Sequence, residues 1–436
     1  MRVASKRFEM SQQSIQDSVS NMATGKVMNQ AESFDLLKSP DVQSPFEFAA
    51  WLREENPVYW NDQYQVWMLS RYRDVKDALL SPRKFSSRWT EPFERRRDRL
   101  PSEAHADFDD GVKFFYGHFH ASDPPAHTGQ RQATMKAFMP LVTGVVRASL
   151  ERRVSGLLDN VERAGTCDFI KEFAYPLPAG VIFDLLGIPE EYHQVISEVS
   201  ESYADFPNAV YAADCKALAV IADRTRRAKS SLMQLIQLRR QETQNDLISA
   251  LVRTENGMEL LPDEDIVHLS CFLLIAGHET TVSLLGGAMR YLLQDRSQWE
   301  RLLAEPDLLP GAVEELLRFV SPLLWVGRVV AEDHELHGKL LRKGSGVLLG
   351  IGAANHDPLE FTSPEVLDVS RKNVLSIAFG YGIHTCLGAA LTRMEAQVAL
   401  SQLLQRIPNA QICTDQFEYH PSFFLRNLKS LRISVG

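Results

Sequence analysis

The chain has 436 residues, of which 44% are hydrophobic and 24% are charged, and this composition is that of an ordinary globular protein. Its formal net charge of −9 argues against a general nucleic-acid-binding protein, because such proteins are normally basic. The five cysteines are scattered along the chain, show no zinc-site spacing and suggest no disulfide framework, so a reducing, cytoplasmic location fits: Cys167, Cys215, Cys271, Cys386 and Cys413.

The apolar stretches are too short or too interrupted to predict an integral membrane segment. The longest apolar zone, Ile266 to Leu293, contains two histidines, a glutamate and an arginine, whereas a spanning helix needs about 18 uninterrupted apolar residues. Residues 1–30 are rich in Ser, Gln, Asn and Met, and we expect a disordered N-terminal tail there. No repeat or linker divides the remainder, so residues 31–436 are expected to form a single domain.

The first ordered elements alternate between helix and strand. The pattern predicts a short helix from Pro45, strands at Val58–Trp60 and Gln65–Leu69, and a helix over Arg73–Leu80. Residues 86–120 show no clear period and include the charge run Glu94–Arg99. We interpret this run as a solvated loop or helix face, and a lid over a pocket is the alternative.

A helix begins near Pro125 and carries His127 and Arg131 four residues apart, on one face. Two such groups together suit an anionic partner such as a carboxylate. A surface pair without a ligand is the other interpretation that this spacing allows. From about Leu141 to Arg240 the pattern is mostly helical, with breaks at Gly165, Pro176–Pro178 and Gly187–Pro189.

A second helical pattern runs from Pro262 to about Leu293, roughly 30 residues or about 45 Å, long enough to cross the molecule. Its middle reads Ala276-Gly277-His278-Glu279-Thr280-Thr281, and a glycine and an acid–alcohol pair are costly inside an apolar helix. A functional interpretation is a notch for a small ligand, with Glu279 and Thr280 delivering protons. A kink with back-bonded threonines is the alternative.

The segment Phe379-Gly-Tyr-Gly-Ile-His-Thr-Cys-Leu-Gly388 ends a glycine-rich loop, and apolar residues at four- and three-residue spacing then predict a helix beginning at or just after Cys386. Free backbone N–H groups and the helix dipole favour a thiolate there. The glycines leave room for a flat, bulky partner beside the sulfur. A buried structural cysteine is the ordinary alternative.

Five segments resemble the motifs of the cytochrome P-450 family and occur in that family's order. They are Asp123–Arg131, Ala276–Thr281, the Glu315-x-x-Arg318 pair with Arg371, Ala354–Pro358 (with His356 where the family has Arg) and Phe379–Gly388. The resemblance covers the chain from about residue 45 to its end. It implies a mainly α fold, the cytochrome P-450 fold, with a helix-rich lobe, a small β-rich lobe, and haem between the long central helix and the cysteine loop.

The resemblance also implies a role for each site residue. Cys386 is the expected axial thiolate of haem b, and its electron donation favours O–O cleavage. Glu279 and Thr280 are expected to manage protons, and Glu315, Arg318 and Arg371 to brace the cysteine loop. The expected haem contacts are His127, Arg131, Arg328, His384, Phe379, Gly388 and Ala276. The expected substrate pocket is formed by Phe272, Ile275, Ala276, Thr281, Leu324, Val326, Phe423 and Phe424.

The implied activity is that of a monooxygenase, which inserts one oxygen atom from O2 into a lipophilic small molecule by hydroxylation or epoxidation. A terpenoid, steroid, fatty acid or polyketide would suit the apolar pocket. The chain shows no flavin or iron–sulfur module, so the expected electron donors are separate proteins, a ferredoxin or flavodoxin with its reductase. Three alternatives stay open at this point: a peroxide-driven peroxygenase, a non-catalytic haem-thiolate sensor or binding protein, and a haem-free helical scaffold.

Overall fold

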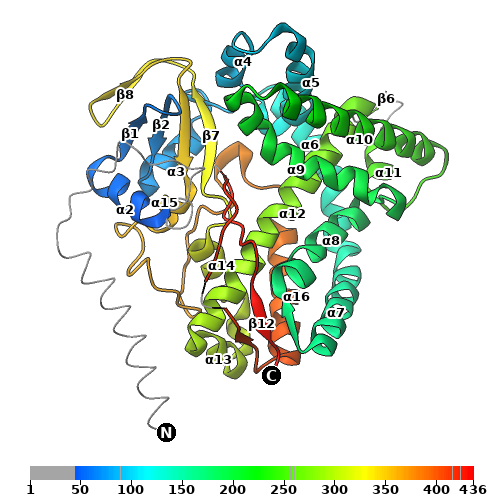
Figure 1. Ribbon diagram of the computed structural model, residues 1–436, viewed down its shortest axis with the longest axis vertical. Coiled ribbons are helices and arrows are strands. Elements are labelled where there is room, and N and C mark those ends of the chain that lie inside the picture. Colours follow the sequence, from blue (N-terminus) through cyan, green and yellow to red (C-terminus); the bar gives the residue numbers. More distant parts are fainter. Residues whose placement is uncertain (1–44, 89, 256–257, 260, 415, 423) are drawn as a thin grey trace.

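The computed structural model describes residues 45–88, 90–255, 258–259, 261–414, 416–422 and 424–436. The expected N-terminal tail, residues 1–30, and Phe423 of the expected pocket lie outside these residues. The described chain forms a small β-rich lobe and a larger helical lobe, with α12 running through the middle (Figure 1). Mainly α architecture with small sheets is what the sequence predicted.

The β-rich lobe is built on a five-stranded sheet in the order β1-β2-β10-β7-β3, in which β10 pairs with β2 in parallel and with β7 antiparallel. The predicted strands near residues 58 and 66 are confirmed, as are the first helix and the helix after them. The lobe comprises α2 (Pro45–Glu55), β1 (Val58–Asn61), β2 (Val66–Leu69), α3 (Tyr72–Leu80), β3 (Phe85–Ser86), β7 (Trp325–Val330), β8 (His334–Leu336), β9 (Lys339–Leu341), β10 (Gly346–Gly350) and α15 (Ile351–Asn355).

The helical lobe contains the long helices, joined by short turns. They are α4 (Glu91–Arg97), α5 (His105–Tyr116), α6 (Ala126–Gly144), α7 (Val146–Ala164), α8 (Pro176–Leu186), α9 (Glu190–Ala212), α10 (Cys215–Gln241), α11 (Leu247–Leu251), α12 (Asp263–Gln294), α13 (Arg296–Ala304), α14 (Leu309–Val320) and α16 (Ala389–Arg406). The short elements are η1 (Ser102–Ala104), η2 (Phe119–Ala121), η3 (Ile170–Ala174), η4 (Pro306–Leu308), η5 (Gly382–His384), β4 (Thr166–Asp168), β5 (Thr254–Glu255), β6 (Met258–Glu259), β11 (Gln411–Ile412) and β12 (Arg432–Ser434).

The breaks predicted between residues 141 and 240 are confirmed at all three places. Gly165 and Gly187 follow the ends of α7 and α8, and each has a positive φ that suits glycine. At the third place η3 ends at Ala174 and α8 begins at Pro176, so Pro176 and Pro178 lie in the first turn of α8, where proline is well tolerated.

The central helix α12 is the core of the helical lobe. It packs against α8, α9, α10, α14 and α16, and its acidic first turn follows Pro262, which is the N-cap and not the first helical residue as predicted. By length and composition α12 could cross a membrane, but 72% of its most apolar window is buried inside the protein. Such burial is that of a core helix.

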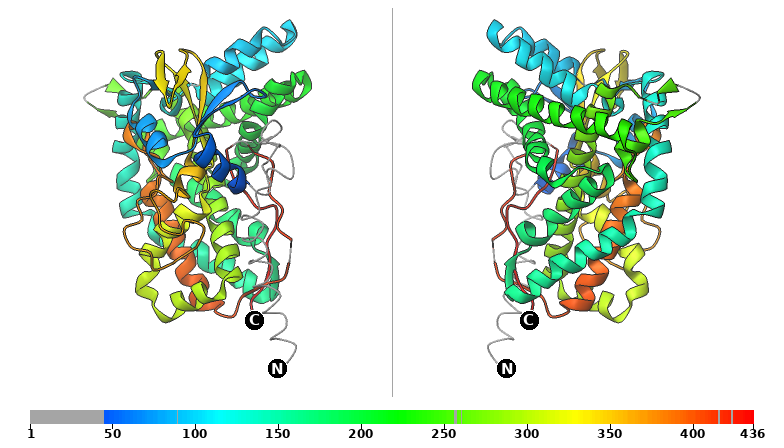
Figure 2. Two further views of the ribbon diagram at one scale, coloured as in Figure 1. Left: turned by 90° about the vertical axis from the view of Figure 1, so that its left-hand side faces the viewer. Right: turned by 90° about the vertical axis from the view of Figure 1, so that its right-hand side faces the viewer.

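The stretch 86–120 differs most from its prediction. It is largely helical, as α4 and α5, with only part of it irregular. Gly111 sits in the middle of α5 because a Cβ there would come within 2.3 Å of the Phe206 ring on α9. Figure 2 shows α5, α9 and α10 together at one end of the molecule, and the contacts among these helices agree.

The arginines of α4 connect both lobes. Arg95 donates to the carbonyl of Gly344, in the turn before β10, at 2.7 Å. The guanidinium of Arg96 lies 3.7 Å from the ring centroid of Tyr211 on α9. The charge run is therefore on a helix face, which was one of the two interpretations favoured from the sequence.

Candidate active site

Cys386 lies between η5 and α16, on a loop with tight backbone geometry. Its N–H donates to the carbonyl of Phe379 at 2.8 Å, which closes the loop. Gly380 and Gly382 have φ values of 68° and 73°, and a Cβ on Gly382 would come within 2.9 Å of the Leu79 carbonyl oxygen. These two positions therefore require glycine. Gly388 has an ordinary negative φ, and a Cβ there would lie 3.9 Å from the Cys386 sulfur.

The environment of Cys386 is enclosed but accessible. The residue is exposed, yet burial raises the pKa of its thiol, an effect opposed by a Gly388 backbone hydrogen bond and by the charges of Arg131 and Arg393. The exposure of the residue and the effect of burial on its pKa agree if the sulfur faces a hollow inside the protein. The helix α16 begins only at Ala389, three residues further on, so the helix dipole alone does not stabilise the predicted thiolate of Cys386. A bound metal cation would supply the additional stabilisation.

One stripe of α12 is accessible within an otherwise buried helix. Between Ile266 and Met289 every residue is buried except Phe272, Ala276, Gly277, Glu279 and Thr280. Phe272, Ala276 and Thr280 are spaced by four residues, so they share one face. A Cβ on Gly277 would lie 2.7 Å from Ile182 on α8, so this glycine also permits close helix packing.

The acid–alcohol pair on α12 has defined partners. Thr280 Oγ1 donates to the Ala276 carbonyl at 2.6 Å, the back-bonded geometry of the alternative interpretation, although α12 continues through it unbroken. Glu279 Oε2 accepts from Asn427 Nδ2 at 2.6 Å. Burial, followed by the charge of Glu201, raises the pKa of Glu279. The carboxyl therefore holds its proton more tightly than a solvated one, which suits proton transfer.

Thr281 does not belong to the accessible stripe. It has no exposed surface, and its Oγ1 donates to Glu395 Oε2 on α16 at 3.5 Å. The prediction that Thr281 lines the substrate pocket was therefore wrong, because adjacent helical residues point about 100° apart. Burial raises the pKa of Glu395 to about 8, so the carboxyl beside Thr281 is largely protonated at neutral pH.

Four of the predicted haem-contact residues lie together on α6, β7 and η5. The His127 and His384 ring centroids are 4.2 Å apart, and Arg131 donates to the carbonyl of Thr385. Arg328 is 6% exposed and donates to its neighbour's carbonyl, at Gly327. Among the described residues, no carboxylate pairs with Arg131 or Arg328. We call His127, Arg131, Arg328 and His384 the anion-binding cluster.

The electrostatics of this cluster show that an anion is its natural partner. Burial lowers the pKa of Arg328 to about 10, and burial with the neighbouring Arg328 charge lowers that of His384 to about 3. Both ring nitrogens of His127 and Nε2 of His384 are buried without a hydrogen bond of good geometry to any described residue. Since buried polar groups are normally satisfied, these donors fit the two carboxylates of a haem.

Behind the cysteine loop, Glu315 and Arg318 meet as their spacing predicted, and Arg371 joins them as the family resemblance implied. Arg318 donates to both carboxylate oxygens of Glu315 at 2.7 Å, and neither side chain has exposed surface. Arg371 Nε forms an ion pair with Glu315 Oε1 at 3.0 Å, although the angle is poor for a hydrogen bond. Arg318 also donates to the carbonyls of Asn355 and Pro364. We call these three residues the brace.

The remaining predicted residues lie beside these groups. Phe379 packs under the Arg393 guanidinium at 4.5 Å, and Arg393 is itself paired with Glu314. Leu324 and Phe424 are in contact, since Leu324 N donates to the Phe424 carbonyl at 2.7 Å. Ile275 is buried and Val326 partly buried.

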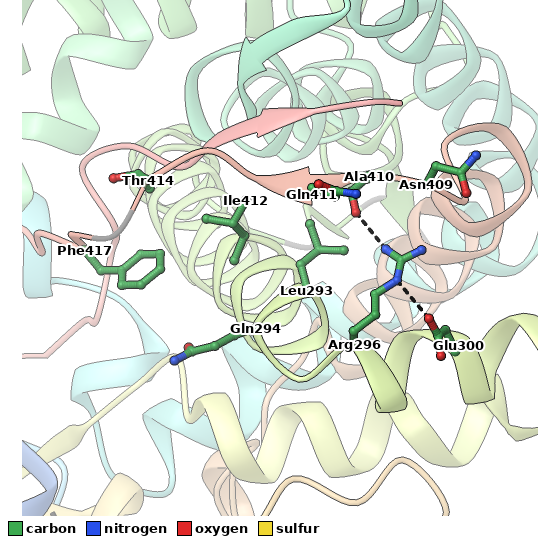
Figure 3. Close-up of a pocket in the computed structure, with 10 residues that line it drawn as sticks. All are labelled: Leu293, Gln294, Arg296, Glu300, Asn409, Ala410, Gln411, Ile412, Thr414 and Phe417. Atoms are coloured by element: carbon green, nitrogen blue, oxygen red, sulfur yellow. Dashed lines mark hydrogen bonds and ion pairs between the residues drawn. The ribbon is translucent and has the colours of Figure 1, made fainter. Parts of the chain in front are cut away.

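A separate hollow of about 700 Å³ lies at the C-terminal end of α12 (Figure 3). It contains none of the predicted site residues. Arg296, its central cation, already contacts the carbonyls of Ala410 and Pro408 and the carboxylate of Glu300. The guanidinium of Arg296 is therefore already paired within the protein.

The family model for cytochrome P450 matches residues 37–409. The chain belongs to the cytochrome P450 family. The polyketide biosynthesis cytochrome P450 PksS of Bacillus subtilis is 32% identical over 402 residues, which are 90% of this chain and 96% of that protein. The chain is thus an oxidoreductase of the monooxygenase type that binds haem, with the thiolate of Cys386 as its axial ligand.

Two solved structures show the same fold. CYP109E1 of Bacillus megaterium in complex with testosterone is 32% identical, with a TM-score of 0.75, over 90% of this chain and 99% of that one. P450BioI in complex with an acyl carrier protein bearing hexadec-9Z-enoic acid is 32% identical, with a TM-score of 0.81, over 91% of this chain and 100% of that one. The family uses O2, redox partners and lipophilic substrates.

Two groups near the site were missed in the sequence. Asn427, the partner of Glu279, comes from a C-terminal segment that carries no recognisable pattern. His118 and His120, just before α6, contact Phe272, and the His-x-His spacing before Asp123-Pro124 was the signal available for them.

Proposed function

We propose that this chain hydroxylates or epoxidises a lipophilic small molecule of the natural-product, terpenoid, steroid or fatty-acid type, using O2 and external electrons. The observation that carries the proposal is the accessible stripe Phe272–Ala276–Thr280 on the buried helix α12. Its apolar members suit a lipophilic ligand, and its hydroxyl suits proton delivery. The relatives named for polyketide biosynthesis or bound to a steroid support the substrate class.

Bound haem supplies the O2 chemistry, and the residues of the chain supply binding and protons. In this proposal His127, Arg131, Arg328 and His384 bind its carboxylates, and Ala276, Phe379 and Gly388 contact it. Phe272, Ile275, Ala276, Leu324, Val326 and Phe424 line the substrate side. Glu279, with its raised pKa, holds a transferable proton, and the Thr280 oxygen can accept a hydrogen bond because Thr280 donates its own hydrogen to the Ala276 carbonyl.

Electrons come from a separate ferredoxin or flavodoxin with its reductase, and we place the protein in the cytoplasm, with residues 31–436 as one catalytic domain. Arg393, which lies against Phe379 of the cysteine loop, is a cation that such a donor could contact, but it is paired with Glu314 at 2.5 Å and 3.0 Å. A docking surface that uses Arg393 would therefore have to compete with this pair.

The test begins with the reduced protein and carbon monoxide, which give a red-shifted Soret band when a cysteine thiolate binds the haem. Spin-state shifts across a panel of terpenoids, steroids, fatty acids and polyketides then identify ligands. Turnover with O2 and an electron donor is the expected result. Turnover with peroxide alone favours the peroxygenase alternative, which the Glu279–Thr280 pair disfavours. A protein that binds no panel member and consumes no O2 contradicts the proposal.

A further inference from the structure

Two histidines outside the anion-binding cluster form a stacked pair beside α12. The Nδ1 atoms of His118 and His120 are 3.0 Å apart, and the ring centroids are separated by 4.1 Å. Both rings contact Phe272, at centroid distances of 4.2 Å and 4.3 Å. Phe272 is the first member of the accessible stripe, so the two histidines lie beside that end of the stripe.

The hydrogen positions of this pair follow from its partners. His118 Nε2 lies 3.1 Å from the Phe115 carbonyl oxygen, which only accepts, so this nitrogen carries a hydrogen. Burial lowers the pKa of His118 to about 3 and that of His120 well below its usual value, so both rings are neutral. A neutral ring has one N–H, and therefore His118 Nδ1 accepts from His120 Nδ1.

The consequence is that His120 Nε2 has no hydrogen and offers a lone pair. This atom is buried, and no described residue donates to it. Its electrostatic neighbours are Arg328 and His384 of the anion-binding cluster, as well as His118. A buried acceptor without a donor is unfavourable, so a ligand that donates a hydrogen bond there gains affinity.

We propose that His120 is a specificity-determining residue whose Nε2 accepts a hydrogen bond from an O–H group of a ligand held between Phe272 and the anion-binding cluster. The O–H belongs to a hydroxyl or carboxyl group of the substrate, or to a protonated carboxyl of the haem. The substrate is the favoured source, because the cations Arg131 and Arg328 keep the haem carboxyls ionised, and an ionised carboxylate cannot donate. The inference rests on the proposed function and narrows it to lipophilic substrates that carry an O–H group.

The test compares the wild-type holoenzyme with three variants. His120→Leu removes the acceptor and keeps an apolar side chain against Phe272, whereas His120→Gln supplies a new acceptor in its amide oxygen. Phe272→Leu is the packing control, since it changes the neighbouring surface without changing a polar atom. Spin-state titrations use matched pairs, testosterone and 1-dodecanol among them, each as the free alcohol and as its methyl ether.

We expect the wild type to bind the alcohol of a pair roughly three- to tenfold more tightly than the ether, the value of one hydrogen bond. His120→Leu loses this preference and His120→Gln recovers part of it, while Phe272→Leu weakens both members of a pair alike. The other possible source of the O–H group is a protonated haem carboxyl, and the resonance Raman bending bands of the haem propionates in substrate-free protein test for it. A change of these bands in His120→Leu, but not in Phe272→Leu, assigns the hydrogen bond to the haem carboxyl.

Equal alcohol preference in wild type and His120→Leu, together with unchanged propionate bands, overturns the inference. If no alcohol–ether pair shifts the spin state, the propionate bands alone test the inference, and unchanged bands in His120→Leu overturn it. The red-shifted carbon monoxide band separates this outcome from failure of the proposed function. His120→Leu keeps that band when only the role of His120 is wrong, whereas its absence from the wild type removes the haem-thiolate premise.

Discussion

Replacing Glu315 with Gln tests the brace behind the cysteine loop. Glu315 and Arg318 have no exposed surface and share two hydrogen bonds of 2.7 Å. The substitution keeps the shape of the side chain but leaves the buried guanidinium without its carboxylate. Breaking a buried pair in this way costs about 3–5 kcal/mol, because the remaining charge stays desolvated.

Arg371→Gln is the matched control in the same brace. Arg371 is partly exposed, with 16% of its side chain accessible, and its removal leaves the Glu315–Arg318 pair intact. The expected cost is smaller than for Glu315→Gln, because Arg371 is partly hydrated and its ion pair with Glu315 lacks good hydrogen-bond geometry. The structure therefore predicts that Glu315→Gln is clearly the more damaging of the two.

Urea unfolding followed by circular dichroism measures the difference. With a urea slope of about 3 kcal/mol/M, the midpoint of Glu315→Gln falls by roughly 1 M, and that of Arg371→Gln by less. Since the brace holds the chain that leads to Cys386, Glu315→Gln also converts part of the red-shifted carbon monoxide band to the unshifted form. Equal midpoints for the two variants would refute the reasoning from burial.

Three further predictions concern single groups. Cys386→Ser abolishes the red-shifted carbon monoxide band, whereas Cys413→Ser, at another exposed cysteine, keeps it; the reverse pattern rules out the ligand assignment. Thr280→Ala keeps the band but diverts electrons from product to peroxide, measured as peroxide formed per electron pair, while Thr281→Ala, at the buried neighbour, leaves this ratio near that of wild type. Glu395 has a pKa raised from 4.5 to about 8 by burial, so its contribution to stability is complete below about pH 4.5 and is lost as the pH rises through about 8. The unfolding midpoint of Glu395→Gln, relative to wild type, therefore rises across this window, and a constant difference contradicts a buried, protonated Glu395.

The sequence predicted the parts of the site that depend on local chemistry. The period of α12, the glycines of positive φ before Cys386 and the four-residue spacing of His127 and Arg131 are all readable within a few turns of chain. The structure brought these groups together without changing their local conformation. Local patterns of this kind survive folding because tertiary contacts reinforce them.

The predictions that failed depended on contacts between distant segments. Gly111 interrupts the apolar pattern of α5, and it packs against Phe206, about a hundred residues away. The sequence pattern alone therefore did not predict this helix. The choice between Thr280 and Thr281 as pocket residue depends on where α16 places Glu395. No role was predicted for His120, whose tautomer follows from the carbonyl of Phe115 that the folded chain brings to His118.

The two adjacent arginines of α4 have a consequence for motion. Arg95 and Arg96 hold opposite lobes, and an exposed hydrogen bond and a cation–π contact are each worth about 0.5–1 kcal/mol. Detaching these two side chains together therefore costs only about 1–2 kcal/mol, whereas Arg97 of the same helix stays paired with both carboxylate oxygens of Asp109 on α5. We expect the link that α4 makes between the two lobes to open without unfolding the neighbouring helices, with α4 staying attached to α5 through Arg97 and Asp109.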